Sequence, residues 1–127
     1  MRRTHLMIAT AALAALGGTA VARADGDVAK GEKVFAKCKT CHEIATDKNK
    51  VGPTLQGVIG RKAGTVPGFK YSEAMMASGV TWDATTIAEY IKQPKDFIAG
   101  NKMAFPGLKK EDEIENLVAF LQAKCCS

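Results

Sequence analysis

The chain has 127 residues, which predicts one small domain. It carries 18 Lys and Arg against 13 Asp and Glu, and these cations are not gathered into a basic stripe with interleaved aromatic residues. A nucleic-acid-binding surface is therefore not predicted.

The N-terminal segment has the layout of a secretory signal peptide. Two arginines are followed by an apolar run at 6–16 and by a small-x-small cleavage pattern at 22–24. We expect residues 1–24 to be removed, leaving residues 25–127 as a periplasmic domain without stable membrane insertion. The apolar run is too short to span a bilayer, and the alternative is an uncleaved membrane anchor. Cleavage takes three arginines away and leaves 15 cationic side chains against 13 anionic ones.

Four helices are predicted in the remaining chain. The first begins with Asp27 as N-cap and runs to about Cys38, with Gly31 on its apolar side. A glycine inside a helix costs about 1 kcal/mol relative to alanine, so Gly31 indicates a close crossing with another helix. The other helices are expected at 72–78, at 83–93 with Asp83 as N-cap, and from Asp112, a predicted N-cap followed by Glu115 at the third helical position.

Long loops make up most of the rest. Residues 46–68 and 96–107 are rich in Gly, Lys and Pro, and no segment shows the alternation of a strand. The fold class is therefore all-α. Two long loops in so small a domain fold poorly unless a large bound group organises them.

The run Cys38-Lys39-Thr40-Cys41-His42 is a C-x-x-C-H motif, the attachment signature of c-type haem. Two cysteines three positions apart on a helical turn can each form a thioether with one vinyl group of a porphyrin. The imidazole that follows then faces the iron. Bacterial haem attachment takes place outside the cytoplasm, so the motif agrees with the export signal. We therefore expect one covalently bound haem c on Cys38 and Cys41, with His42 as an iron ligand.

Three other roles are open to these cysteines. A thioredoxin-like pair would follow a strand, and no strand is predicted here. A structural zinc site needs four ligands, and only Cys125 and Cys126 remain as spare cysteines. The third role is a disulfide between Cys38 and Cys41.

The sixth iron ligand must be Met, Lys, water or nothing. His42 is the only histidine left after residues 1–24 are removed, so a second imidazole cannot be supplied. Met75 and Met76 stand on a helical segment, where methionine fills the core by default. Met103 lies in a loop bracketed by Gly and Pro, so backbone geometry sets where its thioether points. Met103 is the predicted ligand, on this ground and on the resemblance that follows.

The chain resembles the class I c-type cytochromes of mitochondria and photosynthetic bacteria over residues 25–124. The resemblance implies the cytochrome c fold, in which crossing N- and C-terminal helices, two or three shorter helices and long loops wrap one covalent haem. Besides the haem motif, it is carried by residues 31–35, 51–55, 60–62, 67–71, 81–82 and the Met103 loop.

The resemblance also implies roles for individual side chains. The carbonyl of Pro53 would accept the Nδ1–H of His42 and orient the ring. Tyr90 would lie beside the Met103 sulfur, and Phe105 would shield the exposed haem edge. Four donors would hold or lie near the haem propionates: Arg61, Tyr71, Trp82 and Asn101. The ordinary alternatives are core aromatic residues and a solvated loop cation.

Two features depart from the family pattern. Met75 stands where many relatives carry a small polar residue near a network of water and propionate. Cys125 and Cys126 at the tail are not a family feature, and we expect a frayed, exposed pair. Such a pair would form a strained vicinal disulfide or link two chains of an otherwise monomeric protein.

The predicted function is a soluble one-electron carrier that cycles between Fe(II) and Fe(III). Its partners would be electron donors and acceptors: a quinol-oxidising cytochrome complex, a terminal oxidase, a reductase or a reaction centre. They would dock transiently at a lysine-rich haem edge. The candidate docking lysines are Lys37, Lys39, Lys50, Lys95, Lys102, Lys109 and Lys110.

Two other functions are compatible with a haem. One is a haem enzyme or gas sensor with an open sixth position, in which Met103 is only a loop residue. The other is a structural or signalling role in which the redox couple is incidental. Binding of carbon monoxide to the reduced protein separates the first from a carrier.

Overall fold

The computed structural model describes residues 26–126, so the predicted signal peptide lies outside the described residues. Within this part the chain forms helices, loops and one isolated antiparallel bridge between Lys62 and Thr81, without a strand. The all-α prediction is confirmed. The helices are α1 Val28–Phe35, α2 Glu73–Ala77, α3 Ala84–Lys92, α4 Pro94–Phe97 and α5 Glu111–Lys124.

Helix α1 begins where the sequence predicted, because the Asp27 side chain accepts the backbone N–H of Lys30 at 2.8 Å. It ends at Phe35, before the predicted Cys38. Beyond Phe35 the backbone bonds tighten to i→i−3, as in the N–H of Cys38 to the carbonyl of Phe35 at 2.7 Å. These tight turns carry the two cysteines of the haem motif.

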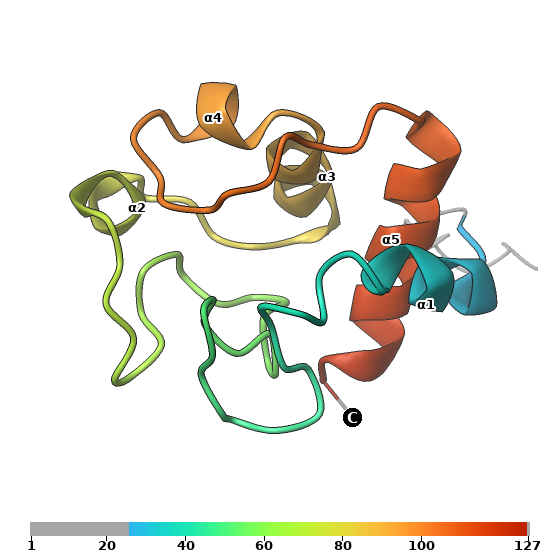
Figure 1. Ribbon diagram of the computed structural model, residues 1–127, viewed down its shortest axis with the longest axis horizontal. Coiled ribbons are helices and arrows are strands. Elements are labelled where there is room, and N and C mark those ends of the chain that lie inside the picture. Colours follow the sequence, from blue (N-terminus) through green and yellow to red (C-terminus); the bar gives the residue numbers. More distant parts are fainter. Residues whose placement is uncertain (1–25, 127) are drawn as a thin grey trace, which may run out of the picture.

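The crossing of α1 over α5 closes one end of the molecule (Figure 1). A Cβ at Gly31 would overlap the carbonyl oxygen of Asn116 on α5, so only glycine allows this approach. Beside it the rings of Phe35 and Phe120 lie 5.0 Å apart. The Asn116 side chain also accepts the N–H of Asp27 at 2.8 Å. The predicted crossing at Gly31 is confirmed.

Side-chain N-caps mark the start of two of the shorter helices. Ser72 caps α2, and Asp83 with Thr86 forms a capping box on α3. Pro94 follows α3 and also occupies the first turn of α4, a short helix that the sequence pattern did not predict.

The predicted start of the last helix is wrong. Helix α5 begins at Glu111, its N-cap is Lys110, and no side chain makes a cap hydrogen bond. Three acidic residues in its first turn, Glu111 to Glu113, instead complement the positive end of the helix dipole. Asp112 therefore lies inside the helix.

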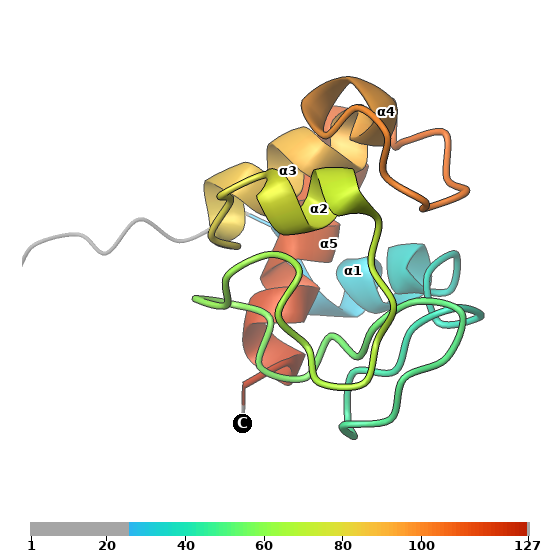
Figure 2. The same ribbon diagram turned by 90° about the vertical axis from the view of Figure 1, so that its left-hand side faces the viewer.

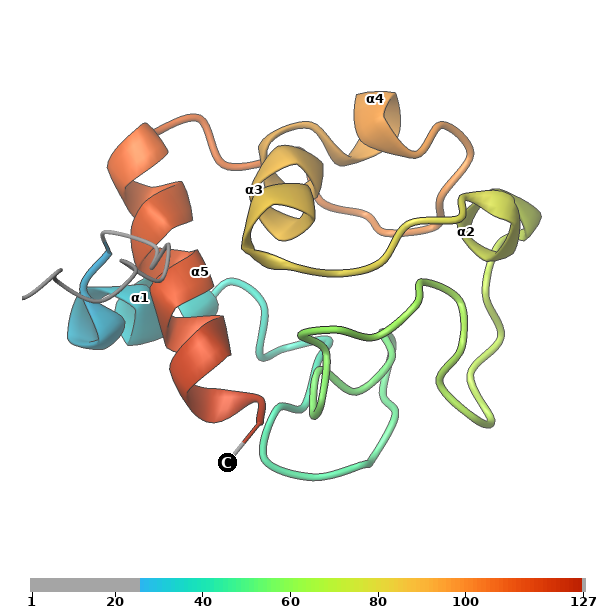
Figure 3. The ribbon, with the colours of Figure 1, turned by 180° about the vertical axis from the view of Figure 1, so that it is seen from behind.

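The residues that line the main cavity of the fold come from three sides of the molecule. Helix α3 and the segment 98–108 lie on one side, the long loop 42–70 lies on the other, and the α1–α5 pair closes the end (Figures 1 and 3). Figures 1 and 3 show α2 at the far end from that pair, and Figure 2 shows it above the loop that precedes it. The largest fully buried side chains are Ile114, Leu117 and Pro94. Ile114 and Leu117 are on α5, so this helix supplies a large share of the buried core.

The tail cysteines differ from the frayed pair that the sequence predicted. Cys125 is the C-cap of α5 and is buried, and its carbonyl accepts the N–H of Gly57 at 2.7 Å. Only Cys126 is exposed. The two are joined to each other by a disulfide, so neither thiol is free to link two chains.

None of the helices between residues 26 and 126 has the length and apolar character needed to cross a bilayer.

Candidate functional site

A large apolar cavity occupies the space between α3, α5 and the long loops. Its wall is formed by predicted site residues together with core side chains. The predicted site residues on it are Cys38, Cys41, His42, Pro53, Arg61, Tyr71, Trp82, Tyr90, Met103 and Phe105. Of the eleven residues predicted from the sequence, only Asn101 does not line it.

The two cysteines of the motif reach this cavity from the turns after α1. Both are free thiols and both are half-buried. Burial raises the pKa of the Cys38 thiol to about 11, against the smaller opposing effect of Lys37. A thiol with a raised pKa is unlike the low-pKa thiolate of a thioredoxin-like pair. Among residues 26–126, no three His, Cys, Asp or Glu side chains gather as metal ligands.

The ring of His42 is fixed by its backbone neighbours. Its Nδ1 lies 2.7 Å from the carbonyl oxygen of Pro53, which is the hydrogen bond that the family resemblance implied. A carbonyl only accepts, so Nδ1 carries the hydrogen and Nε2 keeps its lone pair. Burial lowers the pKa of His42, with Pro53 opposing, and this keeps the imidazole neutral. A neutral Nε2 is the form that binds a metal.

Gly52 supports the same ring and was missed by the sequence analysis. A Cβ at this position would overlap the imidazole atoms of His42. The ring therefore packs directly on the Gly52 backbone. The signal was present as a glycine next to Pro53, but only the folded loop shows what approaches it.

Three polar or aromatic side chains line another part of the wall. Arg61 donates to the carbonyl oxygens of Gln56 at 3.1 Å and Thr54 at 2.9 Å, which leaves its other N–H groups available. The Tyr71 hydroxyl accepts the N–H of Val66 at 3.0 Å and keeps its own proton to donate. Trp82 is buried, with its ring 5.0 Å from that of Tyr90. These three can supply donors to an anionic group in the cavity.

Met103 is presented by the loop between α4 and α5. Its sulfur lies 3.9 Å from the hydroxyl of Tyr90, which is buried on α3. Burial raises the pKa of Tyr90 to about 12, so the phenol stays protonated and donates. Phe105 is half-buried on the same loop and lines the cavity.

Met75 and Met76 differ in burial and in their position relative to the cavity. Met75 lines the cavity as a half-buried side chain. Met76 is 53% exposed, so the expectation of a buried packing residue is wrong for Met76. Two thioethers, those of Met75 and Met103, therefore reach the cavity wall from residues 26–126.

Asn101 does not match its predicted role as a propionate donor. Both N–H groups of its amide are used on backbone carbonyl oxygens, those of Pro94 at 2.7 Å and Ile98 at 2.8 Å. Its side chain holds the Met103 loop instead.

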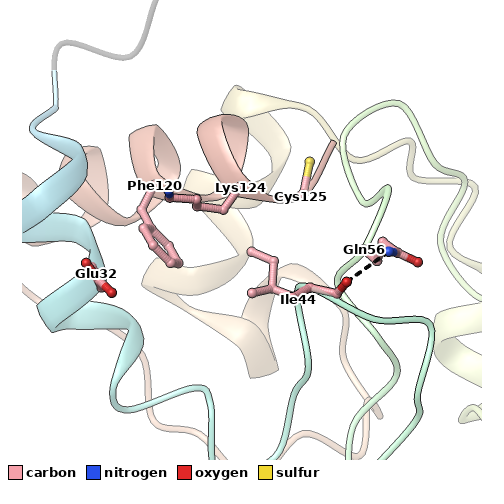
Figure 4. A pocket seen from close by; sticks show the side chains of 7 residues that line it. Glu32, Ile44, Gln56, Phe120, Lys124 and Cys125 are labelled. Atoms are coloured by element: carbon pink, nitrogen blue, oxygen red, sulfur yellow. Dashed lines mark hydrogen bonds between the residues drawn. The ribbon is translucent and has the colours of Figure 1, made fainter. Parts of the chain in front are cut away.

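A second hollow of about 280 Å³ lies between α1 and the C-terminal end of α5 (Figure 4). Gln56 spans its rim by donating to the carbonyl oxygen of Ala45 at 3.1 Å. None of the predicted haem-site residues lines it. The chemistry of the motif therefore belongs to the first cavity.

Known proteins are similar to this chain in sequence and fold. The family model for cytochrome c matches residues 28–124. Cytochrome c2 of Rhodomicrobium vannielii is 49% identical over 109 residues, which cover 85% of this chain and 87% of that protein. Cytochrome c-550 of Nitrobacter winogradskyi is 52% identical over 97 residues, with coverage of 76% and 89%. The solved structure of cytochrome cH from Methylobacterium extorquens matches with a TM-score of 0.74 and 44% identity, over 78% of this chain and 100% of that one.

The residues of the cavity fit a covalently attached haem. Two free thiols and a neutral imidazole reach it from one segment, and a thioether beside a donor hydroxyl reaches it from the Met103 loop. The remaining wall is largely apolar, as a porphyrin face requires. Its cofactor is one covalently bound haem c, and the chain belongs to the cytochrome c family.

Proposed function

We propose that this protein is a one-electron carrier, with its haem bonded to Cys38 and Cys41. His42 and Met103 would ligate the iron. The observation that supports this assignment is that two side chains able to bind iron line the same cavity: His42, held by Pro53, and Met103, beside Tyr90. The bound iron supplies the Fe(II)/Fe(III) couple. A thioether is a neutral ligand, so it favours Fe(II) and raises the potential.

The surrounding side chains would keep water and other ligands away. Trp82 and Tyr90 are buried and line the cavity, and Phe105 lines it as a half-buried side chain. Arg61, Tyr71 and Trp82 would donate to the propionates, because a carboxylate at a half-buried site needs hydrogen-bond partners. If His42 and Met103 both bind the iron, no ligand position would remain for oxygen or peroxide. This arrangement suits a carrier rather than an enzyme.

Electron partners would dock at the mouth of the cavity. Lys37 and Lys102 line it, and Val51, which also belongs to the lining, is 80% exposed. Lys37 lies 4.0 Å from Glu113, so its charge is partly compensated. Two lysines and an exposed apolar residue on the lining of one cavity fit the transient docking of an acidic partner. We propose a quinol-oxidising complex as donor, and an oxidase, reductase or reaction centre as acceptor.

The docking assignment predicts a charge effect on rate. Lys102→Glu should slow electron exchange with an acidic partner complex several-fold at low salt, because steering depends on charge near the contact. The difference should shrink as ionic strength rises. Lys124→Glu is the matched control, since this exposed lysine lies on the C-terminal end of α5 outside the cavity wall. Equal slowing by both variants would contradict docking at the cavity mouth.

We further propose that residues 1–24 direct export and that the mature domain works in the periplasm as a monomer. Mass measurement of the secreted product in non-reducing solution tests the proposal. It should show cleavage after Ala24, one haem per chain and no covalent dimer.

Exposure to carbon monoxide tests the carrier assignment. The reduced protein at neutral pH should show no change in its absorption spectrum under carbon monoxide, because a bound thioether holds the sixth position. Treatment with acid acetone tests the attachment separately, and the haem should stay on the chain because thioether bonds are covalent. A Cys38→Ala, Cys41→Ala double variant is the control for this measurement, and it should release its haem. Rapid formation of a carbon monoxide complex by the unaltered protein would favour a sensor or an enzyme.

A further inference from the structure

The side-chain amide of Asn101 makes four hydrogen bonds, and each of its polar positions is used. Its nitrogen donates to the carbonyl oxygens of Pro94 at 2.7 Å and Ile98 at 2.8 Å. Its oxygen accepts the backbone N–H of Met103 at 2.8 Å and the Tyr90 hydroxyl at 3.3 Å. An amide offers two donor hydrogens and two acceptor lone pairs. Asn101 is therefore saturated within the protein.

These four bonds connect α3, α4 and the loop that carries Met103. Pro94 is the first residue of α4, Tyr90 is on α3, and Met103 belongs to the loop that follows α4. Asn101 is half-buried, so water cannot freely replace its bonds. The amide thus anchors the Met103 backbone to the two helices behind it.

The Tyr90 hydroxyl has a single proton and two acceptors within reach. The Asn101 oxygen lies 3.3 Å from it and the Met103 sulfur 3.9 Å. An amide oxygen is a good acceptor, whereas a thioether is a weak one. The Tyr90 hydroxyl therefore donates mainly to the Asn101 oxygen, which is both the nearer and the stronger acceptor.

We propose that Asn101 is the positioning residue of the Met103 loop, and that it competes with the Met103 sulfur for the Tyr90 hydroxyl. The proposal rests on the proposed ligation by Met103. A hydrogen bond to the thioether withdraws electron density from it and disfavours Fe(III). By taking that bond, Asn101 leaves the sulfur a stronger ligand and limits the reduction potential.

The test is a double-mutant cycle on the haem-loaded protein with Asn101→Leu and Tyr90→Phe. The readouts are the reduction potential, the near-infrared Met-to-iron absorption band and the affinity of the oxidised protein for imidazole. Asn101→Leu should raise imidazole affinity about tenfold or more, because several hydrogen bonds that hold the Met103 loop are lost. The change in potential that it causes should be more positive when Tyr90 is intact than when it is combined with Tyr90→Phe. Equal changes in the two backgrounds would overturn the proposal.

Tyr90→Phe alone gives a second measurement if the leucine variant does not fold. It should change the reduced-to-oxidised equilibrium less than tenfold, or about 59 mV, because the sulfur holds the smaller share of the proton. A larger fall would show that the sulfur already takes the hydroxyl, and the proposal would be wrong.

Asn49→Leu is the matched control. The Asn49 amide likewise donates to a proline carbonyl, that of Pro67 at 3.1 Å, and accepts a backbone N–H, that of Thr54 at 3.0 Å. Asn49 does not line the cavity, so its replacement should change the imidazole affinity and the reduced-to-oxidised equilibrium by less than twofold. Met103→Ala distinguishes an error in the ligand assignment from an error in the role of Asn101. If it leaves the near-infrared band intact, the ligand assignment fails; if it removes the band while the Asn101 cycle is additive, only the Asn101 proposal fails.

Discussion

Met103→Ala should leave the haem attached and lower the reduction potential by a sizeable part of the roughly 0.8 V that axial ligands span. The proposed attachment is through Cys38 and Cys41, which reach the cavity from the turns after α1 and not from the Met103 loop. The loss of a neutral sulfur removes the preference for Fe(II). Alanine also leaves the sixth position open, so the reduced variant should bind carbon monoxide. Potentiometric titration and the spectrum under carbon monoxide measure both effects.

Met75→Ala is the matched control, because Met75 is the other thioether that reaches the cavity from residues 26–126. It removes the same number of atoms from α2 and should leave the near-infrared band in place. Met76→Ala provides a second control at an exposed position. The ligand assignment would be reversed if Met75→Ala opened the iron to carbon monoxide while Met103→Ala did not.

The features that the sequence predicted well depend on neighbours close along the chain. The Asp27 and Asp83 caps bind N–H groups three residues ahead, so a short pattern specifies them. The haem motif is likewise contained in five residues. Gly31 makes a long-range contact that could still be predicted, because a glycine on the apolar face of a helix is costly unless another helix approaches it closely.

The features that were missed depend on contacts that no local pattern encodes. Asn101 was assigned to the propionates from its type and resemblance alone. Its acceptor Pro94 is seven residues away and its donor Tyr90 eleven, so only the fold shows that its amide is fully used. The start of α5 was misplaced for a different reason. Acidic residues occupy the whole first turn, and the capping pattern cannot tell a cap from a favourable dipole contact.

Gly31→Ala should lower the free energy of unfolding by about 3 kcal/mol, the upper end of the usual cost of overpacking. At an exposed helical site the same change would gain about 1 kcal/mol in helix propensity. Here the added methyl group would meet the Asn116 carbonyl and lie 2.7 Å from the Phe120 Cβ. A backbone carbonyl inside α5 cannot rotate away, so the two helices must separate. The consequence is a loss of packing along the crossing that closes one end of the haem cavity.

Denaturant unfolding of the haem-loaded protein measures this prediction, with Glu32→Ala as control. Glu32 is the next residue of α1 and is exposed, so its replacement should change stability by no more than about 0.5 kcal/mol. Because the haem stays covalently attached, its absorption should persist while the denaturation midpoint falls for Gly31→Ala. An unchanged or raised midpoint would mean that α1 and α5 tolerate a wider crossing. In that case the contact between Gly31 and Asn116 would not determine how closely α1 and α5 pack.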